Sequence, residues 1–414
     1  MPSVKAVVEH PDETLRRART LRLEVGSKTI RTPCRALTLR DASSESRLIK
    51  HQTLHGLNEI YRTLSKTKLD EIDGDQNKAL EFGRSLKSVL NSQQAKDDIS
   101  LLIFSYENKN KETERPKNVL PSDKEVQSIC NVVTHPLIDA IIPPRIGGLS
   151  GEAYLQFLKK FFATLPSYEK NPPIIGFIPF LASTDFDQIA NFYLEKGIYS
   201  FIADFENNNP VDAYLFAGQI HRLSDYIDKE YREDAFLHAL NIPSTRTRQK
   251  VDVTPAKDII TFAMGFDSYG TSHLPQKLPE KVIKQIMERR AAGGFGGSGS
   301  SRPTIALDAE DAEVFRLFNR SDYGYYRSSL ANLKSTIPDE ENISIKFDHL
   351  FDDEISENKI KKLRRIFNVE RQATEANDLK LQIASNSIMK HIGSKKFARD
   401  SVRILNKVNN QSYL

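Results

Sequence analysis

Residues 258–273, DIITFAMGFDSYGTSH, combine a short apolar run with a group of polar side chains. The run from Ile259 to Met264 is too short for an ordinary helix and predicts a buried strand. Asp267 then lies just past the carboxyl end of that strand, and the loop beyond it carries Ser268, Tyr269 and His273. In an α/β barrel, side chains in this position perform the chemistry, because the strand holds them rigidly. An aspartate after a glycine also caps ordinary turns, so a structural role for Asp267 stays open.

The composition is that of a folded protein in water. Of the 414 residues, 39% are hydrophobic and 28% are charged. No run approaches the roughly 18 apolar residues of a membrane span, and the first residues lack a signal core. We therefore expect a cytoplasmic protein. Cys34 and Cys130 are the two cysteines, and no histidine cluster accompanies them, so we expect no metal and no cofactor.

Positive charge is concentrated at the C-terminus. From Lys359 onward there are 13 Lys and Arg against 4 Asp and Glu, a sum of +9 within a net charge of +4 for the whole chain. Apolar stripes in this segment predict helices that dock on the rest of the protein. A basic tail on an acidic body indicates contact with phosphates, and a solvated helical face is the alternative. The nucleic-acid contacts expected here are Lys395, Lys396 and Arg399.

Strand-like and helix-like segments alternate along most of the chain. A hairpin is expected at about residues 20–31, a first barrel strand at 36–40 and helical structure within 44–96. Further strands are expected at 99–104, 137–142, 174–180, 199–204 and 235–240, and helices at 151–165, 186–196 and 212–229. Such alternation indicates parallel pairing through right-handed crossovers. With 259–264 there are seven strands before residue 270, and Thr304–Leu307 or Ile343–Phe347 is expected to supply the eighth.

This count favours a (β/α)8 TIM barrel over an open doubly wound sheet. We expect residues 1–300 to form the catalytic barrel. Residues 301–414 are expected to complete it and to form a mostly helical appendage, basic from about 359. The glycine-serine tract Gly293–Ser301 lacks the ending of a phosphate-binding loop and is expected to be a flexible loop.

Four short segments, taken in order, resemble the tRNA-guanine transglycosylase superfamily. They are Thr32-Pro33, IIGFIP at 174–179, LHALNIP at 237–243 and MGFDS at 264–268. The resemblance covers roughly residues 20–275 and implies a barrel enzyme that replaces guanine in nucleic acid by another base, with Asp267 as the nucleophile. The zinc motif of that family is missing, and its acid/base motif is reduced to FSYE at 104–107. The chain therefore looks like a divergent zinc-less member, similar to those that insert a 7-deazaguanine base into DNA.

Base exchange at a nucleoside needs two acidic groups. One carboxylate attacks the sugar carbon and forms a covalent intermediate, as in retaining glycosidases, while the other assists the leaving base. We expect Asp267 to attack and Glu107 or Asp204 to assist. The residues expected to bind substrate are Tyr106, Arg145, Gly176, Glu206, Asn207, His238, Ser268, Tyr269 and His273. A lone histidine on a buried strand, such as His238, is more often a core residue.

The expected partners are nucleic acid, either DNA or tRNA, and a 7-deazaguanine-type base. A homodimer or a partner protein is left open. Two other functions also stay open: a different barrel glycosidase or lyase, and an inactive barrel that only binds nucleic acid. Exchange of labelled guanine separates the first from the transferase, and salt-dependent binding without turnover indicates the second.

Overall fold

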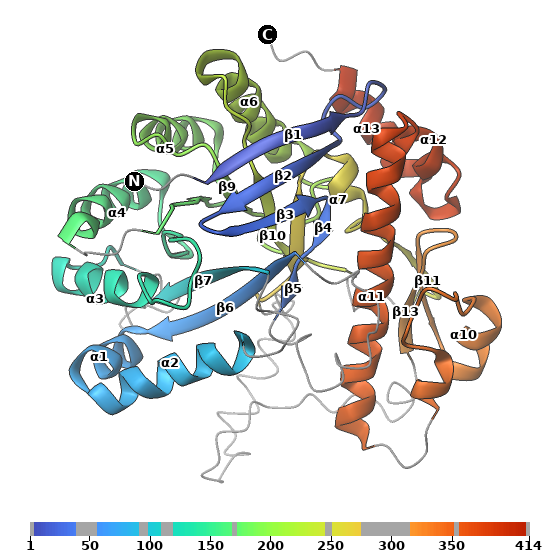
Figure 1. Cartoon of the computed structure of the whole chain (residues 1–414), viewed down its shortest axis with the longest axis horizontal. Coiled ribbons are helices and arrows are strands. Elements are labelled where there is room, and N and C mark those ends of the chain that lie inside the picture. The colour runs from blue at the N-terminus through green and yellow to red at the C-terminus, as the bar shows by residue number, and fades with distance from the viewer. Residues whose placement is uncertain are drawn as a thin grey trace, which may run out of the picture.

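Parallel strands with helices around them form the centre of this mixed α/β protein (Figure 1). The computed structural model describes residues 4–38, 56–90, 98–108, 119–167, 172–244, 251–274, 315–351 and 356–410. Five parallel strands form one sheet, in the order β4 (Cys34–Arg35), β12 (Ser268–Thr271), β10 (Leu237–Ile242), β9 (Phe201–Asp204) and β8 (Gly176–Ile178). Three more form a second parallel sheet, in the order β5 (Leu37–Thr38), β6 (Leu57–Ser65) and β7 (Ile99–Glu107).

Isolated parallel bridges join these two sheets through residues 140–145. The bridges pair Leu101 with Ala140, Ser105 with Arg145, and Ile141 with Ile174. On the other side, β4 and β5 are separated by a single residue of the chain. Backbone pairing therefore passes from β5 through β6, β7 and residues 140–145 to β8, and then through β9, β10 and β12 back to β4. We call these paired parallel segments the ring of strands.

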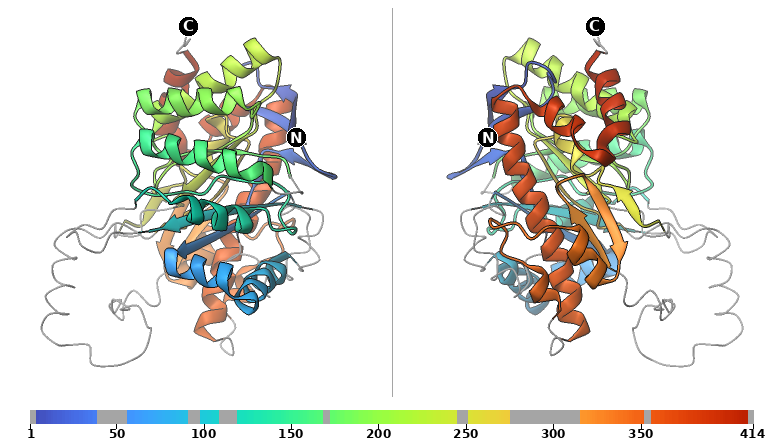
Figure 2. Two further views of the ribbon diagram at one scale, coloured as in Figure 1. Left: turned by 90° about the vertical axis from the view of Figure 1, so that its left-hand side faces the viewer. Right: turned by 90° about the vertical axis from the view of Figure 1, so that its right-hand side faces the viewer.

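Helices connect successive strands and lie outside them (Figure 2). They are α1 (Lys66–Gly74), α2 (Gln76–Leu90), α3 (Asp123–Val133), α4 (Gly151–Thr164) with the 3-10 turn Leu165–Ser167, α5 (Ser183–Glu195) and α6 (Tyr214–Tyr231). Each buries one apolar stripe; on α4 the buried side chains include Tyr154, Phe157, Leu158 and Phe161. Helix α3 begins at a capping box, in which Ser122 and Glu125 satisfy each other's backbone N–H groups.

An antiparallel sheet, β1 (Lys5–Pro11), β2 (Arg19–Val25) and β3 (Lys28–Thr32), covers the amino-terminal ends of the parallel strands. It contacts residues that lie just before those strands. The contacts are Lys28 with Asp139 and with the carbonyl of Asp98, Arg19 with Asp267, and the N–H of Val8 with Asp234. The carboxyl ends of the strands thus form the opposite end of the molecule.

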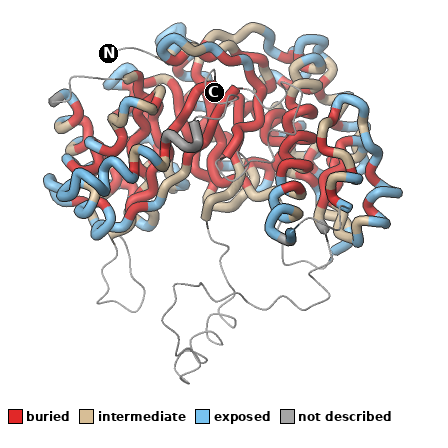
Figure 3. The backbone as a smooth tube through the Cα atoms, turned by 60° about the horizontal axis from the view of Figure 1, so that its bottom comes forward, coloured by how far each residue is buried: buried red, intermediate tan, exposed pale blue. Residues whose placement is uncertain are grey.

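The C-terminal region packs against the side of the parallel strands, with the 28-residue helix α11 (Glu357–Ala384) along them (Figure 1). Its other elements are β13 (Phe315–Asn319), β14 (Gly324–Ser328), α10 (Leu330–Thr336), the 3-10 turn Phe347–Leu350, α12 (Ile388–Gly393), the 3-10 turn Lys396–Ala398 and α13 (Arg399–Asn410). The short strand β11 (Val253–Pro255), from the segment between β10 and β12, pairs with β14. A second apolar core lies beneath α10 and α11, around Leu317, Leu333 and Phe367. Buried residues follow the central strands and the inner faces of the helices (Figure 3).

The structure confirms the hairpin, the four strands β7 to β10 and the helices α4, α5 and α6. The prediction of a strand at 259–264 is wrong. Residues 260–263 form helix α7 (Ile260–Ala263), and the strand is β12, which begins only at Ser268. Every residue of the apolar run is buried, and a fully buried helical turn has the same continuous apolar pattern as a buried strand.

The helical prediction for 44–96 also misses strand β6. Leu57, Ile60 and Leu64 are spaced as on a helix, while the polar Asn58 and Glu59 between them are buried as well. Polar side chains inside the ring of strands therefore conceal the two-residue alternation. Residues 343–346 form no strand and lead into a 3-10 turn. The other candidate strand, Thr304–Leu307, and the tract Gly293–Ser301 lie outside the described residues.

Candidate active site at the carboxyl ends of the strands

Asp267 lies at the amino-terminal end of the parallel strands. Its carboxylate accepts hydrogen bonds from Arg19, at 3.0 Å from Nε and 2.9 Å from Nη2, and from the backbone N–H of Leu237 at 2.7 Å. The Asp267 side chain is 0% exposed. These contacts join the N-terminal sheet to β10 and β12. The expected position of Asp267 beyond a strand's carboxyl end is therefore wrong, because the run before it is a helix.

Polar side chains gather instead at the opposite end, where several parallel strands finish. We call the following set the carboxyl-end cluster: Arg145, Asp204, Glu206, Asn207, Asn241, Ser272 and His273. Hydrogen bonds link its members across strands that are far apart in sequence. Five of the seven were expected at a site from the sequence. The two additions are Asn241 and Ser272.

Arg145 holds two carboxylates of different exposure. Its Nε donates to Asp204, and its Nη2 lies 3.0 Å from Glu206 Oε1. The Asp204 side chain is 1% exposed and also accepts from Asn241 Nδ2 at 2.7 Å. The Glu206 side chain keeps 34% exposure. An arginine fork thus fixes one buried and one accessible carboxylate at the same strand end.

The backbone of this cluster adopts unfavourable conformations. Glu206, Asn207 and Asn241 have φ angles of 48°, 66° and 60°, in the left-handed region, which asparagine adopts more readily than other non-glycine residues, so that the strain falls mainly on Glu206. Asn207 accepts from the Ser272 hydroxyl, and Asn241 accepts from the backbone N–H of His273 at 3.0 Å. Strain of this kind concentrates at functional sites, where surrounding contacts hold it.

Below the cluster, Glu59 on β6 lies inside the ring of strands, between two histidines. His238 Nε2 lies 2.8 Å from Glu59 Oε2, and His273 Nε2 contacts Glu59 Oε1. Burial by itself would raise the pKa of Glu59, but the charge of His273 and hydrogen bonds from both imidazoles outweigh it and lower the pKa to about 2. His273 is also stacked on Tyr61, with ring centroids 4.4 Å apart and 2° between planes.

Three other residues expected at the site, Tyr106, Tyr269 and Gly176, have different positions, whereas Glu107 lies at a neighbouring strand end. Tyr106 donates its hydroxyl to Glu125 of α3, because alternate side chains of β7 point to opposite faces. Tyr269 packs against Phe262, on the outer face of β12. Gly176 allows close packing, since a Cβ there would lie 2.8 Å from the Phe201 ring. Glu107 ends β7 and is half-buried; its charge acts on Tyr61, whose pKa is raised mainly by burial.

The sequence does not indicate Glu59 and Tyr61 as site residues, because the apolar spacing around them predicts a helix. The available signal is the polar pair Asn58-Glu59, which lies between the apolar Leu57 and Ile60. For Asn241 the available signal is its position at the end of a predicted buried strand, two residues before Pro243. Ser268, by contrast, was expected as a substrate contact and is buried, with its Oγ 2.8 Å from His238 Nδ1.

The basic residues of the tail lie elsewhere. Lys395 donates to the carbonyl of Arg320 at 2.9 Å and is half-buried, whereas Lys396 and Arg399 are exposed. The residues before α12 contact the N-terminal sheet region, through Asn386 with the N–H of Glu13. This part of the chain therefore lies closer to the covered amino-terminal ends of the strands than to the carboxyl-end cluster.

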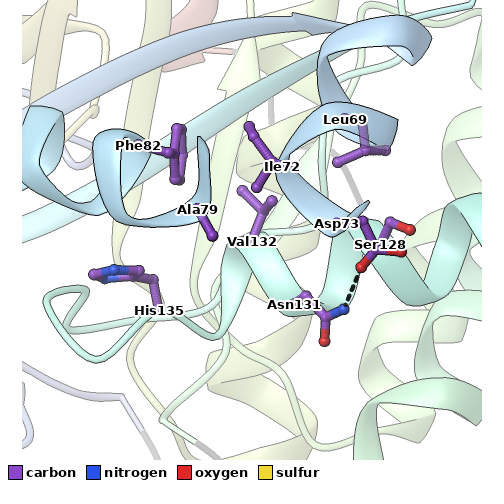
Figure 4. Close-up of a pocket in the computed structure, with 9 residues that line it drawn as sticks. All are labelled: Leu69, Ile72, Asp73, Ala79, Phe82, Ser128, Asn131, Val132 and His135. Carbon is purple, nitrogen blue, oxygen red and sulfur yellow. Dashed lines mark hydrogen bonds between the residues drawn. The ribbon is translucent and has the colours of Figure 1, made fainter. Parts of the chain in front are cut away.

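A pocket of about 240 Å³ opens between α1, α2 and α3 (Figure 4). Its lining is mostly apolar, and its polar side chains largely bond to each other or to backbone, as Asn131 does to Asp73 at 2.9 Å. None of its lining residues belongs to the carboxyl-end cluster. It is a crevice between helices outside the ring of strands.

Among the described residues, no group of three or more His, Cys, Asp or Glu side chains is arranged to hold a metal ion. Of the helices in the described ranges, none combines the length and apolar character needed to cross a bilayer. Comparison with models of known families finds no match for this chain, and comparison with curated proteins finds none either.

Proposed function

We propose that this chain is a (β/α)8-barrel glycosyltransferase that exchanges guanine in DNA or tRNA for a 7-deazaguanine-type base. The barrel assignment is supported by the return of the strand pairing to β4, through eight parallel segments that all precede residue 272. In this proposal residues up to about 300 form the catalytic barrel, and residues 301–414 form the appendage without supplying a barrel strand. The enzyme works without a metal or cofactor.

The reaction takes place at the carboxyl-end cluster, where barrel enzymes hold their reacting groups. The observation that carries the proposal is the pairing of Arg145 with Asp204 and Glu206. Glu206 is the attacking carboxylate, because its side chain keeps 34% exposure whereas Asp204 has 1%. Asp204 holds Arg145 and Asn241 in place. This replaces Asp267 as the nucleophile.

Base exchange requires a carboxylate that attacks the sugar, here Glu206, and a group that gives a proton to the leaving guanine. Glu206 forms a bond to the sugar anomeric carbon while the bond from that carbon to guanine breaks. The bond electrons pass to the guanine nitrogen, which takes up a proton. The incoming base then attacks the same carbon, gives up its proton and releases Glu206.

The test is exchange of radiolabelled guanine into duplex DNA and into unmodified tRNA by the full chain. We expect incorporation by the wild type and a loss of about a hundredfold or more in Glu206→Gln. Glu195→Gln is the matched control, since Glu195 is exposed at the end of α5 and outside the cluster. Absence of incorporation into both nucleic acids, or full activity in Glu206→Gln, refutes the proposal.

A further inference from the structure

We propose that Glu59 is a positioning residue that fixes His273 in the tautomer needed to transfer a proton at the carboxyl-end cluster, supported from behind by His238 and Ser268. The role of His273 in catalysis rests on the proposed function. The arrangement of the four side chains does not depend on it.

The carboxylate of Glu59 has a dedicated place inside the ring of strands. Its side chain is 0% exposed, and it lies directly over the Cα of Gly270 on β12. A Cβ at residue 270 would lie 1.9 Å from Glu59 Oε2 and 2.3 Å from its Cδ. Such a separation is far inside van der Waals contact. Gly270 therefore provides the space that the Glu59 carboxylate occupies.

Hydrogen-bond directions follow from the charge of Glu59. A carboxylate only accepts, so both Nε2 atoms that contact it, those of His238 and His273, carry hydrogen. His238 Nδ1 then accepts from the Ser268 hydroxyl, 2.8 Å away. In neutral His273 the lone pair is left on Nδ1, and no described residue forms a hydrogen bond to that atom.

His273 is the one of these two histidines that reaches the site. Its side chain is 6% exposed, against 0% for His238. Stacking on Tyr61 sets the plane of the ring, and the hydrogen bond from its backbone N–H to Asn241 sets its height. The ionisable groups around this stacked pair are Glu59 below it and Arg145, Asp204 and Glu107 beside Tyr61. Buried contacts thus determine which nitrogen of His273 carries hydrogen, and they also fix the plane and the position of its ring.

In the exchange reaction this arrangement supplies and recovers one proton. Protonated His273 gives its Nδ1 proton to the departing guanine nitrogen as the bond to the sugar breaks. The neutral ring then accepts a proton from the incoming base as the new bond forms. The proton count of the enzyme is unchanged over the cycle, and no further reactant is needed.

The experiment reads the tautomer directly by long-range ¹H–¹⁵N spectroscopy of the histidine rings in the full-length protein, with His273 assigned by His273→Gln. We expect the Nε2–H tautomer in the wild type and a mixed tautomer in Glu59→Gln. Gly270→Ala removes no functional group but displaces the Glu59 carboxylate, so we expect the same mixed tautomer. Both variants should lower kcat for exchange at least about tenfold with little change in KM. Glu195→Gln should change neither the tautomer of His273 nor kcat.

An Nδ1–H tautomer in the wild type, or a wild-type tautomer in folded samples of both variants, overturns the positioning role. The spectra need no substrate, so the two proposals fail separately. If guanine exchange is absent but the tautomer depends on Glu59, the positioning role stands and the proposed function falls. If exchange is present and the tautomer is independent of Glu59, the proposed function stands and the positioning role falls.

Discussion

Replacing Asp267 by Asn distinguishes a structural carboxylate from a catalytic one. The substitution keeps the shape of the side chain and removes its charge. Asp267 accepts both branches of the Arg19 guanidinium and the N–H of Leu237, and its side chain is 0% exposed. A catalytic role predicts a stable and inactive variant. The structure predicts an unstable variant whose folded fraction still works.

The expected loss of stability follows from the burial of this ion pair. Removing one partner of a buried pair costs about 3–5 kcal/mol, because the other charge is left without compensation. Asn retains one acceptor oxygen, and Arg19 keeps its bond to the carbonyl of Ala235, so we expect about 3 kcal/mol. Asp139→Asn is the matched control at the same end. Its partner Lys28 is 25% exposed and Asp139 is 21% exposed, so that pair contributes about 1 kcal/mol or less.

Urea unfolding followed by far-UV circular dichroism measures this difference, since the chain has no tryptophan to serve as a fluorescent probe. We also expect Arg19→Met to recover part of the loss when combined with Asp267→Asn, because the unpaired charge is then removed. Guanine exchange per folded molecule should stay near the wild-type level. A variant with wild-type stability and no exchange activity would refute the structural role and restore Asp267 as the nucleophile.

Two further variants, one single and one double, test other parts of the chain. Burial raises the pKa of Asp258 from 3.8 to about 7, so the folded state retains a proton and loses stability as the pH rises from about 4 to 7. Asp258→Asn should therefore raise the melting temperature by a few degrees at pH 8 and leave it unchanged near pH 4; equal values at both pH values would contradict this. The second variant reverses the exposed Lys396 and Arg399 to Glu and leaves Lys395, which is bonded to Arg320, unchanged. We expect the slope of log affinity for duplex DNA against log salt concentration to fall by about 0.9 per lost phosphate contact. An unchanged slope would mean that this tail is a solvated surface.

Local sequence patterns were sufficient to predict the regular part of the architecture. Continuous apolar runs and helical stripes predicted β7 to β10 and the helices α4, α5 and α6, and turn residues located the hairpin. Because side chains at the carboxyl ends of barrel strands reach the substrate, the same reasoning indicated Arg145, Asp204, Glu206 and Asn207 as site residues. These predictions depend on local patterns, and hydrogen bonds in the structure do join those segments.

The choice of acidic residues for the candidate site depends on contacts between distant parts of the chain. Whether residues 259–264 form a helix or a strand depends on what surrounds them, since every side chain of that run is buried in either case. This choice moved Asp267 to the opposite end of the strands, beside an arginine 248 residues away in sequence. Glu59 entered the site for a related reason. Its partners His238 and His273 lie 179 and 214 residues further along the chain, and only folding brings such groups close enough to compensate a buried charge.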